Sequence, residues 1–270
     1  MDAERIVVIK YGGAAMQGEG LKLGVIQDVS RLAASGAGVV LVHGGGPELT
    51  ALQERLGIET RFVDGLRYTD EGTVDAALMA LCGKVNKDLV RLLENEGQKA
   101  AGLSGIDGGV LRCVRQADPD LGFVGRIESV DTGLLRVLLN AGYVPVVSTV
   151  GLGADGLAYN VNADTAAGRI AAALAADLYI TMSDVPGVLR DAGDPATLIR
   201  EIRAFEVEQL IGAGYISGGM IPKARGVADA LFRGARAALI IDGRVPHALA
   251  ACLRDRESIG TVFVKPDEEG

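Results

Sequence analysis

The fold is decided by the stretch Ile6-Val7-Val8-Ile9-Lys10-Tyr11-Gly12-Gly13. Its four apolar residues predict a short buried strand, and the two glycines predict that the strand ends in a tight turn. Consecutive glycines expose backbone N–H groups, and a lysine beside them adds a positive charge, so together they suit a phosphate group. Lys10, Gly12 and Gly13 are therefore candidates for binding the phosphates of a nucleotide.

Short apolar runs alternate along the chain with longer amphipathic runs, which is the pattern of βαβ units and a largely parallel sheet. We expect strands near residues 5–10, 38–43, 99–103, 143–148, 177–183, 237–241 and 261–264. Helices are expected near residues 20–35, 47–57, 70–96, 132–141, 163–176, 204–213, 219–234 and 246–254, with a β-hairpin region at 108–130. The fold class is thus α/β.

The domain organisation predicted from these runs is one domain, residues 1–270, with two lobes on one continuous sheet. The division falls near residue 175, so the lobes cover about residues 1–175 and 176–270. Open α/β sheets bind ligands at the carboxyl ends of their strands, and we expect the cleft along that edge.

Composition excludes several classes of protein. The formal net charge is −8 without a basic stripe, which argues against a nucleic-acid partner. The three cysteines form no metal-ligand or disulfide spacing, so we expect no zinc site and a reducing, cytoplasmic location. No apolar run approaches the roughly 20 residues of a membrane span. The acidic residues Asp2 and Glu4 argue against a signal peptide.

A second lysine lies far from the first in the sequence. Lys223 follows Gly218-Gly219-Met220-Ile221-Pro222 at the start of an expected helix, and Asp164 ends Asn160-Val161-Asn162-Ala163 before another helix. Two lysines beside bare backbone suggest phosphoryl transfer, with Asp164 orienting both. Asn and Asp residues at the start of a helix also serve as caps, and that structural explanation stays open.

A run of three glycines, Gly44-Gly45-Gly46, leaves the expected strand at 38–43 and precedes a helix. It lets a phosphoryl group or a carboxylate lie against the backbone, and Gly45 and Gly46 are candidate substrate-binding residues. The run is no dinucleotide fingerprint, because Leu49 stands where the third glycine belongs. We assign no catalytic role to His43, since a histidine at the end of a strand is more often structural, and none to His247.

Arg67 lies in Gly65-Leu66-Arg67-Tyr68-Thr69-Asp70, before the long expected helix. Thr69 or Asp70 can cap that helix, but capping does not explain the arginine. A planar guanidinium suits bidentate recognition of a carboxylate. An ordinary surface arginine fits the residues equally well. Asn160 can offer its amide to a polar substrate.

Two further segments suit a nucleotide base and ribose. One ends the expected strand at 177–183 and the other precedes Lys223, although the first can also be a simple turn. The candidate nucleotide-binding residues in them are Asp184, Val185, Pro186, Gly187, Val188, Leu189, Tyr215, Ile216 and Ser217.

Seven motifs in order make the chain resemble the amino acid kinase family over essentially its whole length. They are Ile9 to Gly13, His43 to Pro47, Gly65 to Asp70, Gly83 to Lys87, Asn160 to Asp164, Ser183 to Gly187 and Gly218 to Lys223. The resemblance implies a three-layer αβα sandwich. It implies phosphorylation of the side-chain carboxylate of N-acetyl-L-glutamate by ATP, the second step of arginine biosynthesis, with Mg²⁺ carried by the nucleotide.

The resemblance also implies roles for single residues. Lys10 and Lys223 would stabilise the transferring phosphoryl group, and Asp164 would organise them. Gly45, Gly46, Arg67 and Asn160 would contact the acetylated amino acid. The segments from Asp184 to Leu189 and from Tyr215 to Ser217 would contact the nucleotide.

Three alternatives remain. Carbamate, aspartate and uridylate kinases share the lysines and glycine loops, but the settings of Arg67 and Asn160 favour acetylglutamate. Kinases that act on aminoadipate or glutamate attached to a carrier protein usually carry extra basic residues where Ile221 and Pro222 stand here. A non-catalytic sensing module on the same fold would be expected to lose Lys10, Asp164 or Lys223, and all three are present.

Assembly and regulation follow from the same resemblance. Members inhibited by arginine carry an extra N-terminal helix that links dimers into a hexamer, and the expected first strand leaves no room for one. Leu239 stands where those members commonly have histidine, and Arg256-Glu257-Ser258 departs from their spacing. We therefore expect a homodimer that is insensitive to arginine.

Overall fold

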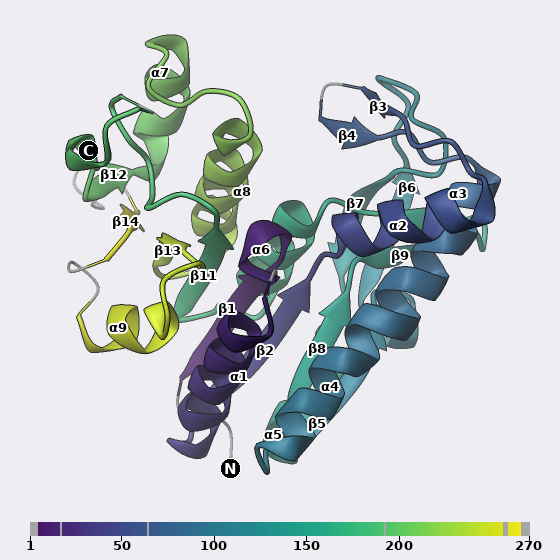
Figure 1. The fold of residues 1–270 in the computed structure, drawn as a ribbon, viewed down its shortest axis with the longest axis horizontal. Helices are drawn as coiled ribbons and strands as arrows, with labels where there is room; N and C mark the ends of the chain where they lie inside the picture. Colours follow the sequence, from purple (N-terminus) through teal and green to yellow (C-terminus); the bar gives the residue numbers. More distant parts are fainter. Residues whose placement is uncertain (1–4, 17, 64, 192, 256–258, 266–270) are drawn as a thin grey trace.

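The computed structural model describes residues 5–16, 18–63, 65–191, 193–255 and 259–265. These residues form a central sheet of eight strands (Figure 1). In spatial order the strands are β12 (Glu201–Arg203), β14 (Thr261–Val264), β13 (Ala238–Asp242), β11 (Leu178–Ser183), β1 (Ile6–Tyr11), β2 (Gly38–His43), β8 (Val144–Ser148) and β5 (Ala100–Ser104). Only the β13–β14 pair in this described sheet is antiparallel, so the expected α/β class with a mainly parallel sheet is confirmed.

Alternate residues of the central strands face two separate cores, because successive side chains of a strand point to opposite faces. Val8 and its neighbour Tyr179 pack with one group of helices, while Val7 and Leu178 pack with the other. Both faces of the sheet are buried, which explains the nearly continuous apolar runs of the sequence.

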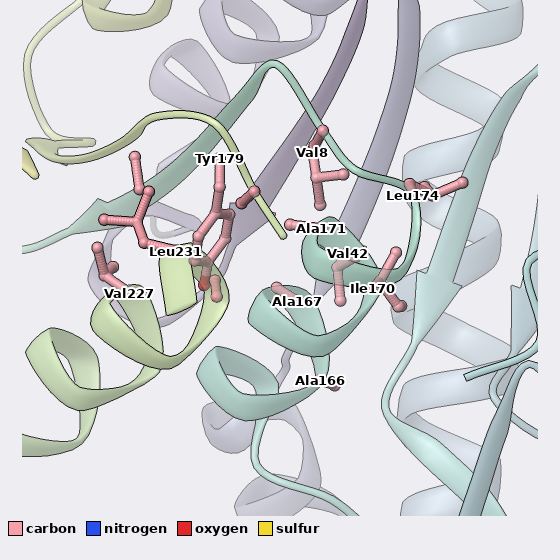
Figure 2. Close-up of a cluster of buried hydrophobic side chains, with 14 of the residues drawn as sticks. Val8, Val42, Ala166, Ala167, Ile170, Ala171, Leu174, Tyr179, Val227 and Leu231 are labelled. Atoms are coloured by element: carbon pink, nitrogen blue, oxygen red, sulfur yellow. The ribbon is translucent and has the colours of Figure 1, made fainter. Parts of the chain in front are cut away.

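Helices cover both faces and complete the three layers. One face carries α1 (Glu19–Ala34), α4 (Asn86–Asn95) and α9 (Ala248–Arg254). The other carries α5 (Gly133–Asn140), α6 (Ala163–Ala173) and α8 (Met220–Arg233), with α7 (Val207–Gly212) beside α8. Figure 2 shows Tyr179 between Ala167 of α6 and Val227 and Leu231 of α8. None of the described helices is long and apolar enough to cross a membrane.

A smaller sheet and a hairpin lie beyond the carboxyl ends of β2 and β8 (Figure 1). The small sheet has the order β10 (Ala158–Asn160), β9 (Val150–Gly153), β6 (Leu111–Arg115) and β7 (Gly125–Val130). The β6–β7 pair is antiparallel, which confirms the β-hairpin expected at 108–130. The separate two-stranded hairpin outside the small sheet pairs β3 (Phe62–Val63) with β4 (Leu66–Arg67).

The remaining helical segments lie between these elements. The helix α2 (Gly46–Leu56) follows β2, and α3 (Glu71–Ala77) follows the hairpin. A π-helix, Leu78–Val85, joins α3 to α4, so the single helix expected at 70–96 has three parts. Short 3₁₀ turns span Gly13–Met16, Asp107–Gly109, Pro195–Thr197 and Ala204–Glu206. Asp2, Glu4 and Arg256 to Ser258, named above, lie outside the described residues.

Candidate active site

Lys10, Asp164 and Lys223 meet in space although they are far apart in the sequence. Lys10 shares the sheet face of Val8, two residues earlier, and so points toward α6. Its Nζ lies 3.0 Å from Oδ1 of Asp164, the second residue of α6. Lys223, in the first turn of α8, donates a hydrogen bond of 3.2 Å to Oδ2 of the same carboxylate. One aspartate therefore holds both lysines, as the sequence predicted.

The electrostatics of this cluster leave one net positive charge in a nearly dry place. The exposed fractions of the side chains are 7% for Lys10, 9% for Asp164 and 20% for Lys223. Burial opposes ionisation of Asp164, but the two lysines hold the pKa of its carboxyl below the usual range. Burial lowers the pKa of Lys10, the carboxylate of Asp164 opposes this, the charge of Lys223 lowers the pKa further, and the charge of Asp184 raises it slightly. An additional anion beside the two ammonium groups would complete the charge balance.

The start of α6 fixes Asp164 from two sides. Asn162 is the N-cap, and its Oδ1 accepts hydrogen bonds from the backbone N–H of Asp164 at 2.9 Å and of Thr165 at 3.1 Å. Asn162 therefore caps α6, which confirms for this residue the structural explanation that the sequence left open. The hydroxyl of Tyr179, buried in β11, donates to the backbone carbonyl of Asp164 at 3.2 Å. The carboxylate is held by its helix and by the sheet beneath it.

The glycine loops after β1 and β2 lie against each other and against α6. The backbone N–H of Gly44 donates to the carbonyl of Tyr11 at 3.2 Å. A Cβ on Gly12 would lie 3.4 Å from the nitrogen of Gly44, and one on Gly44 would lie 3.4 Å from Cβ of Ala163. Gly13 lies beyond this contact, begins a 3₁₀ turn with φ +63° and is exposed. The loops of Lys10, of the triple glycine and of Asp164 therefore form one continuous site.

Gly45 fits its position only without a side chain. A Cβ there would lie 2.8 Å from Cδ2 of Leu81 and 3.1 Å from Cγ2 of Val85, both in the π-helix. Gly45 precedes α2, and Gly46 is the first residue of that helix. Backbone N–H groups in the first turn of a helix lack intrahelical acceptors and face a ligand readily.

His43 is a structural residue, as the sequence suggested. It is fully buried; its Nδ1 lies 2.8 Å from the carbonyl of Gly44, and its Nε2 lies 3.1 Å from Nδ2 of Asn86. A carbonyl only accepts, so Nδ1 carries the hydrogen and the ring is neutral with Nε2 as acceptor. Burial lowers the pKa of His43 from 6.5 to about 4. His247 pairs instead with Asp28 in α1, its Nδ1 lying 2.8 Å from Oδ1.

Arg67 is buried at the end of β4, with 9% of its surface exposed, and is no ordinary surface arginine. Its Nη2 donates to Oγ1 of Thr50 at 2.8 Å and to the carbonyl of Gly46 at 3.2 Å, and its Nη1 donates to Oε1 of Gln53. Asp70 is the cap of the following helix, because its Oδ1 accepts from the backbone N–H of Thr73 at 2.8 Å. The guanidinium of Arg67 is therefore bonded to residues of α2, and Asp70 is the N-cap of α3.

Asn160 joins Arg67 through one buried hydroxyl. Its Nδ2 donates to Oγ1 of Thr69 at 3.2 Å, and the same hydroxyl donates to the backbone carbonyl of Arg67 at 3.0 Å. Four residues were predicted to bind the acetylated amino acid. Arg67 is linked to Gly46 by its own hydrogen bond and to Asn160 through Thr69, and Gly45 precedes Gly46 in the chain. Thr69 is fully buried, and its bond to Asn160 joins two segments that lie 91 residues apart in the sequence.

A cavity of about 430 Å³ lies at the carboxyl end of β11, next to Lys223. Its lining includes most of the predicted nucleotide residues: Asp184, Val185, Gly187, Leu189, Tyr215 and Ser217. Pro186, Gly12 and Gly13 do not line it. Val188 and Ile216 are buried in the core at 1% exposure, and the backbone N–H of Val188 donates to Oγ1 of Thr261.

A second cavity, of about 810 Å³, shares Gly219 with the first. Leu66 and Val161 line it, whereas their neighbours Arg67 and Asn160, and Gly45 and Gly46, do not. The segment that leads into α8 therefore lies between the two cavities, with Lys223 on the side of the first.

The sequence matches the family described as "Amino acid kinase family" over residues 5–242. The chain belongs to the amino acid kinase family. Two curated acetylglutamate kinases match nearly its full length. That of Brachyspira hyodysenteriae is 47% identical, and the match covers 97% of this chain and 91% of the relative. That of Actinobacillus pleuropneumoniae serotype 3 is 49% identical, again with 97% and 91% covered.

Solved structures share the amino acid kinase fold. The N-acetylglutamate synthase of Neisseria gonorrhoeae, in complex with coenzyme A and N-acetyl-glutamate, superposes with a TM-score of 0.84 at 25% identity. The match covers 97% of this chain and 60% of that one. The family and the fold predicted from the seven motifs are thereby confirmed.

Sequence reasoning missed the residues that support this amino acid kinase site. Gln53 and Thr50 bond to the guanidinium of Arg67 and were assigned no role. Thr69 bonds to the backbone carbonyl of Arg67 and was considered only as a helix cap. A signal existed for Gln53, because it lies four residues after Leu49 on the apolar side of α2. A polar side chain at such a position needs a buried partner.

Proposed function

We propose that this protein transfers the γ-phosphoryl group of ATP to the side-chain carboxylate of N-acetyl-L-glutamate, the second step of arginine biosynthesis. The observation that carries the proposal is the cluster of Lys10, Asp164 and Lys223 at the carboxyl edge of the sheet, next to the cavity beside Lys223. The two curated relatives have this activity by name.

The reaction makes an acyl phosphate. A carboxylate oxygen of the acceptor attacks the γ-phosphorus, and the bond from that phosphorus to the β,γ-bridging oxygen breaks, releasing ADP. Little covalent work falls to the protein, so positioning and neutralisation of charge supply the catalysis. Lys10 and Lys223 have the charge and the placement to oppose the negative charge of the transferring group, and Asp164 sets the spacing between them.

No general base is required, since an ordinary carboxylate is already ionised at neutral pH. The neutral, fully bonded His43 agrees with a site that has no such role to fill. The acceptor has two carboxylates. If one lies beside the lysines, the other needs a cation of its own, and Arg67 is the buried cation next to Gly46 and Asn160.

We assign the cavity beside Lys223 to ATP, with the described lining residues and the backbone of Gly12 and Gly13 as its contacts. The rest of the predicted segment, Pro186, Val188 and Ile216, would act through the backbone or through packing. Mg²⁺ would be carried by the phosphates of ATP, where it would supply neutralisation of their charge. It retains waters and needs only one or two carboxylates, and Asp184 lines the cavity.

We further propose that residues 1–175 bind the acceptor and residues 176–270 bind ATP, and that the protein is a cytoplasmic homodimer insensitive to arginine. Arg67 and Asn160 precede the division and Asp184 and Lys223 follow it, which supports the first assignment. The backbone of Gly12 and Gly13 would reach the phosphates of ATP from the first lobe. The fully buried Leu239 of β13 supports insensitivity to arginine, because its side chain offers arginine no polar contact. Light scattering and activity measured against millimolar arginine test assembly and regulation together.

A coupled assay of ADP formation tests the function. With ATP present, N-acetyl-L-glutamate should support turnover, while glutamate and aspartate should not. Turnover with glutamate or aspartate but not with N-acetyl-L-glutamate would show that the proposed acceptor is wrong. Turnover only with a glutamate or aminoadipate attached to a carrier protein would favour that alternative. No turnover with any of them, despite binding, would indicate a sensing module.

A further inference from the structure

Within the described residues, the hydrogen bonds of the Arg67 guanidinium all go to neutral acceptors. The three oxygens belong to the hydroxyl of Thr50, the backbone of Gly46 and the amide of Gln53. Within the described residues no carboxylate pairs with Arg67, and burial is the cause that lowers its pKa. The guanidinium is therefore oriented by its neighbours without being neutralised by them.

Burying a cation without a counter-charge costs free energy that hydrogen bonds to neutral groups offset only in part. Such a cation has a strong affinity for an entering anion, because the anion then supplies the missing charge. Three of the five N–H groups are in use, which leaves the Nε–H and one hydrogen on Nη1 for a ligand.

Gln53 is the centre of the network that orients Arg67. It is fully buried in α2; its Oε1 accepts from Arg67 and, at 3.1 Å, from Oγ1 of Thr60. Its Nε2 donates to Oγ1 of Thr73 at 3.0 Å. One amide thus ties α2, the strand β4 and α3 together around the guanidinium.

A neutral side chain at position 53 has a consequence that a carboxylate would not have. Glutamate has nearly the same shape and would also accept from Arg67, but it would neutralise the cation internally. A ligand carboxylate would then meet a paired arginine and gain far less from binding.

We propose that Gln53 is a positioning residue for acceptor binding: it orients Arg67 while leaving its charge free for the second carboxylate of the acceptor. The inference rests on the proposed function in its choice of acceptor. The orientation of Arg67 by Gln53 is a separate statement that holds for any anionic ligand.

Two variants separate orientation from charge. Gln53→Glu keeps an acceptor for Arg67 and adds a counter-charge, but it loses the Nε2 donations to Thr73 and to the carbonyl of Glu59. We therefore expect a Tm no higher than that of wild type, together with a KM for N-acetyl-L-glutamate at least about tenfold higher. Gln53→Leu removes the acceptor, so we expect a lower Tm and a similar rise in KM. In both variants kcat and the KM for ATP should change by less than about threefold. A merely structural role would raise KM only where Tm falls.

The matched control is Thr60→Val, which removes the other donor to the same Oε1 and leaves the bond from Arg67 in place. It should keep both KM values within about twofold. The proposal is overturned if Gln53→Glu binds N-acetyl-L-glutamate as wild type does, or, where that variant fails to fold, if Gln53→Leu does.

A readout without substrate separates this proposal from the proposed function. Relaxation of the ¹⁵Nε nucleus of Arg67, identified by its loss in Arg67→Lys, should report a rigid side chain in wild type and Gln53→Glu. In Gln53→Leu its order parameter should fall measurably below the wild-type value, although the bonds to Thr50 and Gly46 and the contact with the Phe62 ring remain. A rigid Arg67 in Gln53→Leu would refute the orientation by Gln53. Wild-type protein that has a rigid Arg67 but fails to bind N-acetyl-L-glutamate would refute the proposed acceptor alone.

Discussion

Gly168 in α6 lies so close to Gly226 in α8 that a Cβ built on Gly168 would be 2.8 Å from the carbonyl oxygen of Gly226. Each glycine shares a helix face with a residue of the cluster, because residues three or four apart are neighbours on a helix. Asp164 lies four residues before Gly168, and Lys223 lies three before Gly226. The closeness of the two helices therefore allows Lys223 to reach Asp164 at 3.2 Å.

Gly168→Ala should lower kcat by about tenfold or more, because the backbone oxygen it meets must move and take α8 with it. The KM for N-acetyl-L-glutamate should change much less. The control is Gly20→Ala in α1, where a Cβ meets nothing within 4 Å. Steady-state kinetics of both variants tests the idea, and a normal kcat in Gly168→Ala would show that the helix spacing does not matter.

Lys10→Ala and Lys223→Ala should each lower kcat by about 10²–10³, with a far smaller change in the KM of the acceptor. The reason is that the cations oppose a charge that develops on the transferring group, so their effect grows in the transition state. Rapid-quench measurement of the chemical step gives the most direct comparison. A variant with near-normal kcat would remove that lysine from the assignment.

The main strands were predictable because each is an apolar run ended by glycine or a polar residue, and their two buried faces leave little ambiguity. β3, with two residues, and β12, with one apolar residue among three, escape such reasoning. Their pairing depends on partners distant in the chain. The π-helix also escapes, since the apolar pattern of Leu78–Val85 does not distinguish it from an α-helix.

The cluster of Lys10, Asp164 and Lys223 was predictable because each residue ends a strand or starts a helix at one edge of a parallel sheet. The supporting residues were not. Gln53 looks like an unremarkable helical residue until Arg67 is placed beside it, and their bond spans 14 residues across two elements. Val188 and Ile216 belong to a promising motif, yet their side chains are core residues, because a motif does not tell which side chains face the ligand.

Arg67→Lys should raise the KM for N-acetyl-L-glutamate by at least about tenfold and leave the KM for ATP nearly unchanged. Lysine keeps the charge but cannot bond to Thr50, Gly46 and Gln53 with one planar group, so its ammonium is less well oriented. Both KM values come from the same coupled assay. A rise confined to ATP would reverse the assignment of the two lobes.

The buried ring of His43 makes the stability of the protein depend on pH. Its pKa is about 4 in the folded protein, against 6.5 for an ordinary histidine, because burial disfavours the charged ring. Between these values the unfolded chain binds a proton that the folded protein does not. Stability therefore falls as the pH falls from 6.5 toward 4, by about 3 kcal/mol in total, and this contribution is complete above pH 6.5.

His43→Gln removes the titrating ring and keeps a neutral side chain that can accept from Asn86. We expect its free energy of unfolding to be lower than that of wild type at pH 7, with the difference shrinking as the pH falls toward 4. Urea unfolding at pH 7, 6, 5 and 4 measures this difference directly. A difference that stays constant over the range would mean that His43 titrates normally in the folded protein, which would contradict the buried, neutral ring.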